Sequence, residues 1–412
     1  MKGQLSIEQQ RARWRTLTLL AITLIFLMST WFSASAVLPQ LKALWKISQG
    51  TSAWLTIAVQ LGFVIGAVLS SLLNISDIFP VRYVILIGSI GAAFSNALLS
   101  TSNGVIMGIA LRFATGFFLA GVYPPAFKLM STWFRKKRGL ALGLLVSALV
   151  VGNGIPHLVN GLEGLAWKIV IFFTSAMNVI GGLIAMTIKE GPFPFPKATF
   201  DPRQAGQALT NRGVRYTTLG YVGYMWELFA MFAWFSAFFS EALTAKRIDL
   251  ESLAAFATFG VFIAGSLGSW IGGFLSNRLG KINTTILMMA ISGSCSILIG
   301  QLFDAPISVI YFLALIWGAS AVADSAQYST LVIESANPSY VGTALTLQLA
   351  AGFSITAVTI WLIPLLVETI GWHWAFAFLA PGPTLGILSM LKLKSLKNAP
   401  LREDNKDHLA KI

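Results

Sequence analysis

The feature that most constrains the fold is a series of long apolar runs separated by short polar segments. A membrane-spanning helix needs about 20 consecutive apolar residues, whereas the strands of a membrane barrel would alternate over about 10 residues. The chain is 56% hydrophobic and only 11% charged, well below the roughly 25% charge of soluble domains. The sequence therefore predicts an all-α integral membrane protein. About twelve runs reach spanning length, centred near Leu27, Gly62, Gly91, Gly116, Ala148, Met177, Phe229, Phe262, Ser292, Leu315, Phe353 and Leu385.

One polar segment is longer than the others and divides the twelve predicted helices into two sets of six. It covers residues 189–215 and begins with a proline-rich stretch that cannot continue a helix. We therefore predict an N-terminal six-helix bundle over residues 1–188 and a C-terminal bundle with a tail over residues 216–412. The linker between them is predicted to lie in the cytoplasm.

The two predicted bundles resemble each other in sequence. RGLALGLLVSAL at 138–149 aligns with VGTALTLQLAAG at 341–352, and WKIVIFF at 167–173 aligns with WHWAFAF at 372–378. Each pair falls at the fifth or sixth span of its half. Paired halves with a binding site between them near the membrane midplane are typical of secondary transporters.

Basic residues predict the orientation. If the N-terminus is inside, 23 of the 29 Lys and Arg residues lie on the inner side and five on the outer side, which places both termini in the cytoplasm. The formal net charge of +13 is spread over these short segments, so we expect no nucleic-acid partner. The single cysteine, Cys295, excludes a disulfide within the chain and a CxxC metal site. We expect no metal and no cofactor.

Two loops and one span carry a family resemblance. The segment GGFLSNRLGK resembles the loop signature of the major facilitator superfamily, and the equivalent loop of the first half keeps two of its residues. RFATGFFLAG, which contains Arg112, is similar to the family's Arg-x-x-x-Gly pattern. The resemblance implies two bundles that rock about a central cavity, with the loop residues as a cytoplasmic gate. The residues predicted for that gate are Asp77, Arg82, Gly273, Asn277, Arg278, Gly280 and Lys281.

Three charged residues fall inside predicted spans, where charge is expensive and is usually functional. Glu227 lies near mid-membrane and could take up a proton on one side and release it on the other. Asp324 lies in an unusually polar stretch, VADSAQYST. Arg112 could hold a carboxylate or phosphate through two parallel hydrogen bonds. We predict these three for proton coupling; for Arg112 and Glu227 the alternative is a satisfied structural residue.

Other polar residues near these charges and near proline bends are candidates for the cavity. Asp324, Gln327 and Tyr328 share one helix face, and Tyr224 lies three residues before Glu227. For several of these residues, a structural role explains the sequence at least as well. The complete predicted substrate cavity comprises Arg112, Tyr123, Asn153, His157, Tyr224, Glu227, Asp324, Gln327, Tyr328 and Gln348.

These features together predict a proton-coupled secondary transporter for a small polar solute, which Arg112 would make anionic or zwitterionic. Proton-driven efflux of a metabolite or drug is the alternative. A receptor or scaffold that keeps the fold without transport is an alternative of another class. No ATP-binding or hydrolase motif is present, so we do not expect an enzyme. The sequence looks like bacterial members of unassigned substrate, so we predict a multi-pass monomer in the bacterial inner membrane.

Overall fold

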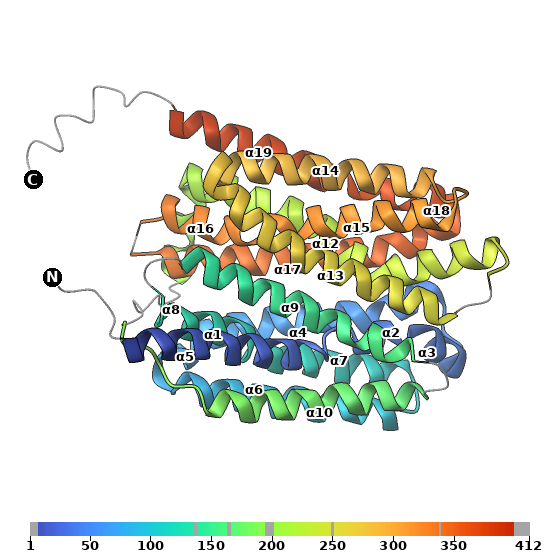
Figure 1. Ribbon diagram of the computed structural model, residues 1–412, viewed down its shortest axis with the longest axis horizontal. Helices are drawn as coiled ribbons and strands as arrows, with labels where there is room; N and C mark the ends of the chain where they lie inside the picture. The colour runs from blue at the N-terminus through green and yellow to red at the C-terminus, as the bar shows by residue number, and fades with distance from the viewer. Residues whose placement is uncertain are drawn as a thin grey trace, which may run out of the picture.

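The computed structural model describes residues 7–134, 138–162, 166–193, 202–248, 251–337 and 339–398, and every regular element in these ranges is helical. The long helices run side by side, and the first described helix begins at the same end of the bundle at which the last one finishes (Figure 1). We call this the termini end and the opposite one the far end. The predicted all-α membrane fold is confirmed, because eleven helices within these described ranges are long and apolar enough to cross a membrane.

The first predicted span is not among these eleven. Its helix carries four charged residues near its start, at Glu8, Arg11, Arg13 and Arg15, and ends at Met28. The helix still lies alongside the others of its half, packed mainly against two of them and more lightly against a third. It therefore occupies the place of the predicted first span, although its composition is less apolar.

The first half contains the helices up to residue 186. They are α1 (Ile7–Met28), α2 (Ser33–Ala36), α3 (Leu38–Trp45), α4 (Gln49–Leu72), α5 (Ile75–Ile78), α6 (Val81–Leu98), η1 (Leu99–Thr101), α7 (Val105–Leu119), α8 (Tyr123–Ser131), α9 (Arg138–Asn160) and α10 (Trp167–Met186).

Two short helices in the linker precede the second half. They are η2 (Pro202–Gln204) and α11 (Ala205–Thr210). The second half consists of α12 (Arg212–Ala245), α13 (Glu251–Leu279), α14 (Lys281–Gln301), α15 (Ile307–Ala323), α16 (Ser325–Ser335), α17 (Val341–Ile370), α18 (Trp372–Ala375), η3 (Phe376–Leu379) and α19 (Pro381–Asn398).

Helix packing repeats between the halves. In the first half α4 packs on α7, α6 on α10 and α1 on α9; the second half has the corresponding pairs α13 with α15, α14 with α19 and α12 with α17. The halves meet along two further pairs, α4 with α17 and α9 with α13, visible in Figure 1 where α9 lies beside α13. α4 of the first half corresponds to α13 of the second, and α9 corresponds to α17. A two-fold rotation that replaces each half with the other therefore turns one pair into the other, as expected for repeats related by a two-fold axis.

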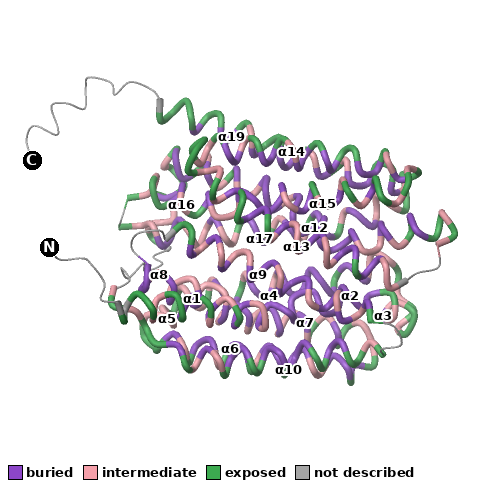
Figure 2. The backbone as a smooth tube through the Cα atoms, viewed as in Figure 1, coloured by how far each residue is buried: buried purple, intermediate pink, exposed green. Residues whose placement is uncertain are grey.

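Glycine permits the closest of these contacts. A Cβ added at Gly62 of α4 would lie 2.0 Å from the Phe113 carbonyl oxygen of α7. At the equivalent contact of the second half, a Cβ at Gly268 of α13 would lie 1.9 Å from the Ala319 carbonyl oxygen of α15. Only glycine allows backbones to approach this closely. Buried residues alternate with exposed ones along the outer helices, such as α19 and α10, and exposed residues lie on the outer sides of those helices (Figure 2).

Two spans are broken at equivalent places. The fourth is divided between α7 and α8, just before the Pro124–Pro125 pair, and the tenth is divided at Asp324 between α15 and α16. The first span is also broken, between α1 and α2, whereas its counterpart α12 is a continuous helix of 34 residues. Breaks at membrane depth free backbone groups that need other partners.

Candidate central cavity

A cavity lies between the two halves. It holds about 1020 Å³ of empty space, including its mouth. The cavity is lined from both halves by Met28, Trp31, Tyr123, Phe127, Leu142, Val146, Leu149, Val150, Asn153, Tyr221, Tyr224, Met225, Leu228, Phe229, Phe232, Val322, Ser325, Ala326, Ser329, Thr330, Ile333 and Phe353. No side chain in this lining, within the described part of the chain, carries a formal charge.

The walls combine aromatic rings with a few hydrogen-bonding groups. Three of these polar atoms are buried and have no protein partner: Trp31 Nε1, Asn153 Oδ1 and Ser325 Oγ. The indole N–H is a donor, the amide oxygen an acceptor and the hydroxyl either. Neighbouring side chains cover these three atoms in this conformation, and buried polar atoms are usually bonded, so each would gain a partner if the cavity wall rearranged around a ligand.

The cavity reaches the surface toward the termini end. Its lining includes the exposed residues Ser329 and Ile333 of α16, and α8 and α16 both lie toward that end in Figure 1. The ligand path is therefore accessible from the termini side in this conformation.

A cluster of aromatic rings closes the cavity on the other side. The rings of Phe63 and Phe353, from different halves, have centroids 4.7 Å apart, and those of Phe232 and Phe262 stack at 4.1 Å. Each ring is no more than 7% exposed. We call this set the aromatic cluster; it comprises Trp31, Phe32, Phe63, Phe229, Phe232, Phe262 and Phe353.

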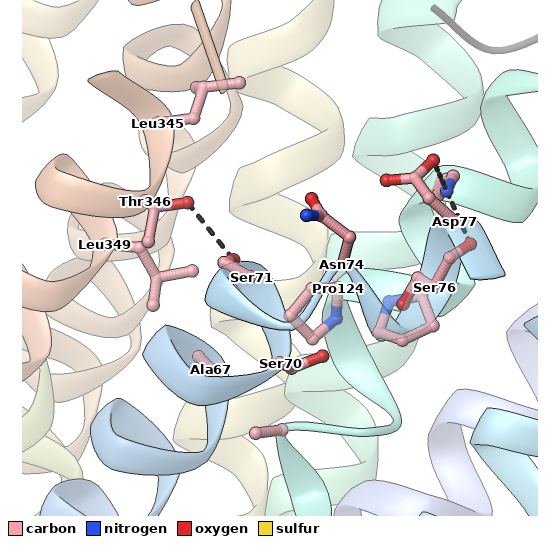
Figure 3. A pocket seen from close by; sticks show the side chains of 13 residues that line it. Ala67, Ser70, Ser71, Asn74, Ser76, Asp77, Pro124, Leu345, Thr346 and Leu349 are labelled. Carbon is pink, nitrogen blue, oxygen red and sulfur yellow. Dashed lines mark hydrogen bonds and ion pairs between the residues drawn. The ribbon is translucent and has the colours of Figure 1, made fainter. Parts of the chain in front are cut away.

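A second, more polar cavity of about 800 Å³ lies behind α8, between the halves at the termini end. Figure 3 shows Ser71 of α4 facing Thr346 of α17, whose hydroxyl oxygens are 3.3 Å apart. On the opposite side of this cavity, Lys128 Nζ lies 2.5 Å from Asp77 Oδ1 and donates to the Ser76 carbonyl. The Ser71–Thr346 contact joins the two halves on the side of α4 and α17.

Arg112 does not line the central cavity. Its guanidinium is fully buried inside the first half and is surrounded by oxygen atoms of that half. Nη1 donates to the Thr30 carbonyl at 2.9 Å, and Nη2 donates to the Trp31 carbonyl. These carbonyls lie at the break between α1 and α2. The remaining acceptors are Ser33 Oγ, Asn96 Oδ1 and the Leu55 carbonyl. The arginine thus supplies partners to a broken span.

Glu227 also lies outside the lining of the central cavity. Its Oε1 accepts a hydrogen bond from Trp317 Nε1 of α15 at 2.7 Å, and its Oε2 accepts one from Ser292 Oγ of α14 at 2.8 Å. The side chain is 2% exposed. Glu227 therefore ties α12 to two neighbouring helices of its own half.

Asp324 lies closer to the cavity. It is 1% exposed, occupies the break between α15 and α16, and immediately precedes Ser325 of the cavity lining. Its Oδ2 accepts a hydrogen bond from the Tyr328 hydroxyl at 2.8 Å. The Tyr328 ring contacts those of Tyr224 and Tyr221, which line the cavity, with centroids 5.2 and 5.6 Å apart. A chain of contacts thus leads from the acid to the cavity wall.

The remaining predicted cavity residues divide in two groups. Tyr123, Asn153 and Tyr224 line the cavity. His157, Gln327 and Gln348 are buried but do not appear in its lining.

These halves, their repeated packing and the cavity between them agree with the sequence comparison. A family model described as Major Facilitator Superfamily matches residues 19–357. The chain belongs to the Major Facilitator Superfamily.

Two curated relatives are fungal. The "MFS transporter asaE" of Aspergillus flavus is 26% identical over 269 residues, which cover 60% of this chain and 55% of that protein. The "MFS-type transporter hasB" of Aspergillus fumigatus is 27% identical over 258 residues, which cover 58% and 56%. The chain spans about half the length of the curated relatives it matches.

Solved structures share the superfamily fold. The nucleoside transporter NupG aligns with a TM-score of 0.71 and 13% identity, covering 93% of this chain and 99% of that one. A human organic anion transporter gives 0.67 and 14%, with 92% and 99% covered. A bacterial homologue of the human lysosomal transporter Spinster, inward-facing and unoccupied, gives 0.66 and 14%, with 93% and 95% covered. At these identities the likeness is one of fold.

The superfamily loop signature takes different contacts in the two halves. In the first half Asp77 pairs with Lys128, while the Arg82 guanidinium lies over the Tyr83 ring at 5.1 Å. The ion pair of Asp77 thus joins α5 to α8.

In the second half Lys281 bonds Glu334 of α16, and Arg278 lies 4.8 Å from the centroid of the Phe274 ring. Gly280 has φ +80°, in the region that favours glycine. Asn277 is exposed, and a Cβ at Gly273 would meet open space.

Sequence reasoning missed several lining residues. Trp31 and Tyr221 belong to apolar, aromatic runs whose composition also suits lipid contact, and Ser325 and Ser329 are small polar residues with no motif. Ser325 and Ser329 are four residues apart, which places them on one helix face. That spacing was the available signal.

Proposed function

We propose that this protein is a secondary transporter that carries an uncharged, largely aromatic or apolar organic solute by alternating access. The observation that carries the proposal is the central cavity, which both halves line and in which no described side chain is charged. Apolar walls with a few placed polar groups are typical of sites for small organic ligands. A charged solute would lose its hydration there without an ionic partner.

Recognition of the solute rests on three polar groups among aromatic surfaces. Asn153 Oδ1 accepts a hydrogen bond from the solute, Trp31 Nε1 donates one, and Ser325 Oγ does either. The anionic solute expected from the sequence depended on Arg112, whose guanidinium faces carbonyls of its own half. A neutral solute with at least one donor and one acceptor fits the cavity better.

We place the termini end in the cytoplasm, because Lys and Arg concentrate in the segments of that end. The open mouth of the cavity then faces the cytoplasm. The bacterial inner membrane stays a prediction, and both curated relatives are fungal. A monomeric state stays a prediction as well.

Proton coupling is assigned to Asp324 in this proposal. The acid sits at a helix break, next to Ser325 of the cavity and bonded to Tyr328. Gain or loss of its proton changes that hydrogen bond, at a place where α15 and α16 can change their relative angle. Glu227 makes two bonds within its helix packing and supports the second half instead.

Efflux is the second candidate, and the position of the cavity mouth favours it. An apolar cavity that opens toward the termini end would load its solute from the cytoplasm. An uptake transporter would have to release an apolar solute at the same mouth. The direction of solute movement along a pH gradient separates these two candidates.

The test begins with a thermal-shift screen of the purified protein against neutral aromatic and heterocyclic metabolites. Hits are then measured for pH-gradient-driven flux in proteoliposomes, with Asn153→Leu as the cavity variant and Thr217→Val as the control. Thr217 is buried and bonds only within its own helix. We expect flux in the wild type and the control, and at least a tenfold loss in Asn153→Leu. Specific binding without flux for any hit would favour a receptor or scaffold.

A further inference from the structure

Several buried polar side chains of the first half lack protein partners although they lie outside the cavity, and among the described residues two of them, Gln60 and His157, carry two polar atoms each with a partner at neither. Gln60 of α4 is 0% exposed, and neither its amide oxygen nor its amide nitrogen has a partner. His157 of α9 is 1% exposed, and neither ring nitrogen has a partner. Buried amides and imidazoles are normally bonded, so two that lack partners at every polar atom need a physical reason.

His157 continues a helix face that leads away from the cavity toward the far end, and Gln60 continues the face of α4 that carries Phe63 of the aromatic cluster. Val150 and Asn153 of α9 line the cavity, and His157 is the next residue on that face, four positions further on. In α4, Gln60 is three positions beyond Phe63, on the same face and nearer the far end. Each step of three or four residues advances about 5 Å along a helix.

The aromatic cluster separates these residues from the cavity. Phe63 belongs to the cluster, and Phe262 of the cluster stacks with the His157 ring at 5.8 Å. Phe262 in turn contacts Phe32 and Phe232. In this conformation the rings cover the side chains of Gln60 and His157, which would otherwise extend the solute path beyond the cavity.

We infer that Gln60 and His157 form a second binding station on the far side of the aromatic cluster, occupied by the solute when the bundle opens at the far end. This inference rests on the proposed function. The amide of Gln60 offers donors and an acceptor, and uncharged imidazole offers one of each. The station therefore takes the same class of solute, neutral and capable of hydrogen bonds.

The same station gives the rings a role. Closing the far end leaves two polar side chains unpartnered, which is unfavourable, and packing the rings together offsets that cost. Opening the far end has the opposite effects: the two polar side chains gain partners, and the packing of the rings is lost. The two conformations are thereby kept close in free energy, as alternating access requires.

Sided labelling of cysteines tests the station without knowing the solute. The chain has one cysteine, so Cys295→Ala provides a cysteine-free background. Gln60→Cys and His157→Cys are introduced singly, with Asn153→Cys and Ser329→Cys as cavity variants. Right-side-out and inside-out vesicles are treated with a trimethylammonium methanethiosulfonate, which does not cross bilayers, and a C-terminal tag identifies the termini side.

Thr115→Cys is the matched buried control, because Thr115 is 0% exposed and bonds only within α7. Labelling after denaturation confirms that each thiol is present, and gel filtration confirms that each variant is folded. We expect Gln60→Cys and His157→Cys to react at least tenfold faster from the far side. Asn153→Cys and Ser329→Cys should react faster from the termini side, and Thr115→Cys from neither.

The outcomes separate the station from the proposed function. If Gln60→Cys and His157→Cys are as unreactive as Thr115→Cys while Asn153→Cys reacts from the termini side, the station is overturned and the cavity stands. Reaction of the two station variants from the termini side would also overturn it, since both would then belong to the central cavity. If Asn153→Cys reacts from neither side, the proposed function itself fails.

Discussion

Arg112 in the first half and Glu227 in the second are charged residues buried within the packing of their own half, and the two halves use that charge differently. In the first half Arg112 donates to carbonyls at the break between α1 and α2. In the second half the corresponding helix, α12, is continuous, and Glu227 within it accepts bonds from α14 and α15. One charge completes a broken helix and the other joins intact helices. A charge inside a span therefore need not mark the transport path.

The largest effect is expected from removing the charge of the first half. Arg112→Leu leaves several buried carbonyl and amide oxygens without donors, and bonds to charged groups contribute about 1.5–3 kcal/mol each. We expect a loss of at least about 3 kcal/mol of stability, a large share of the roughly 5–15 kcal/mol typical of folded proteins. Thermal unfolding of the purified protein in detergent measures it.

Arg112→Lys sharpens this comparison. A lysine keeps the charge but its single ammonium cannot reach acceptors as far apart as those of a planar guanidinium. We expect an unfolding temperature between those of the wild type and Arg112→Leu. A wild-type unfolding temperature for Arg112→Leu would contradict the role given to Arg112.

A smaller effect is expected from removing the charge of the second half. Glu227→Leu deprives Trp317 Nε1 of its acceptor, and an unsatisfied buried donor costs about 1–3 kcal/mol. Glu227→Gln keeps one acceptor for Trp317 and a donor for Ser292, so its stability should stay within about 1 kcal/mol of the wild type. Comparing the two unfolding temperatures measures this difference. Equal losses for Leu and Gln would show that charge, rather than hydrogen bonding, is what the site needs.

The sequence predicted the all-α membrane fold and eleven of its spans, because apolar length depends on composition alone. It could not predict which way a buried side chain faces. Tyr224 and Glu227 are three residues apart on α12, about 60° around the helix axis, yet Tyr224 lines the cavity and Glu227 faces α14 and α15. In a bundle where several helices meet, that rotation changes the neighbours completely.

Helix breaks are a second feature that could not be predicted from the sequence. Arg112 looked like a cavity residue because nothing in the sequence shows that the first span ends at Met28 and resumes at Ser33. The carbonyls released there provide the acceptors for the arginine. No feature of the sequence indicates the break at Asp324 either, although the spacing of four residues predicts the contact between Asp324 and Tyr328.

The two acids of the second half should differ in transport. Asp324→Asn keeps an acceptor for Tyr328 but cannot exchange a proton. We expect pH-gradient-driven accumulation of a solute from the screen to fall at least tenfold while exchange without a gradient is retained. Glu227→Gln is the matched control and should keep driven accumulation. The opposite pattern, loss with Glu227→Gln alone, would assign coupling to Glu227.

The smallest effect is expected where the halves touch at the termini end. Ser71→Ala removes the one hydroxyl contact between Ser71 and Thr346, a neutral bond that contributes about 1 kcal/mol. The equilibrium between conformations should therefore shift by about fivefold toward opening at the termini end. The rate of Ser329→Cys labelling from that side reports the shift. An unchanged rate would show that this contact does not hold the halves together.

The central claim is that the solute path is uncharged because two of the buried charges, Arg112 and Glu227, serve the packing of their own halves. Binding of matched pairs, an aromatic carboxamide and the corresponding carboxylate, tests it most directly when built on a hit from the thermal-shift screen. We predict that the purified protein binds the carboxamide at least tenfold more tightly, and that Asn153→Leu removes this preference. Tighter binding of the carboxylate would contradict the account and return Arg112 to the transport path.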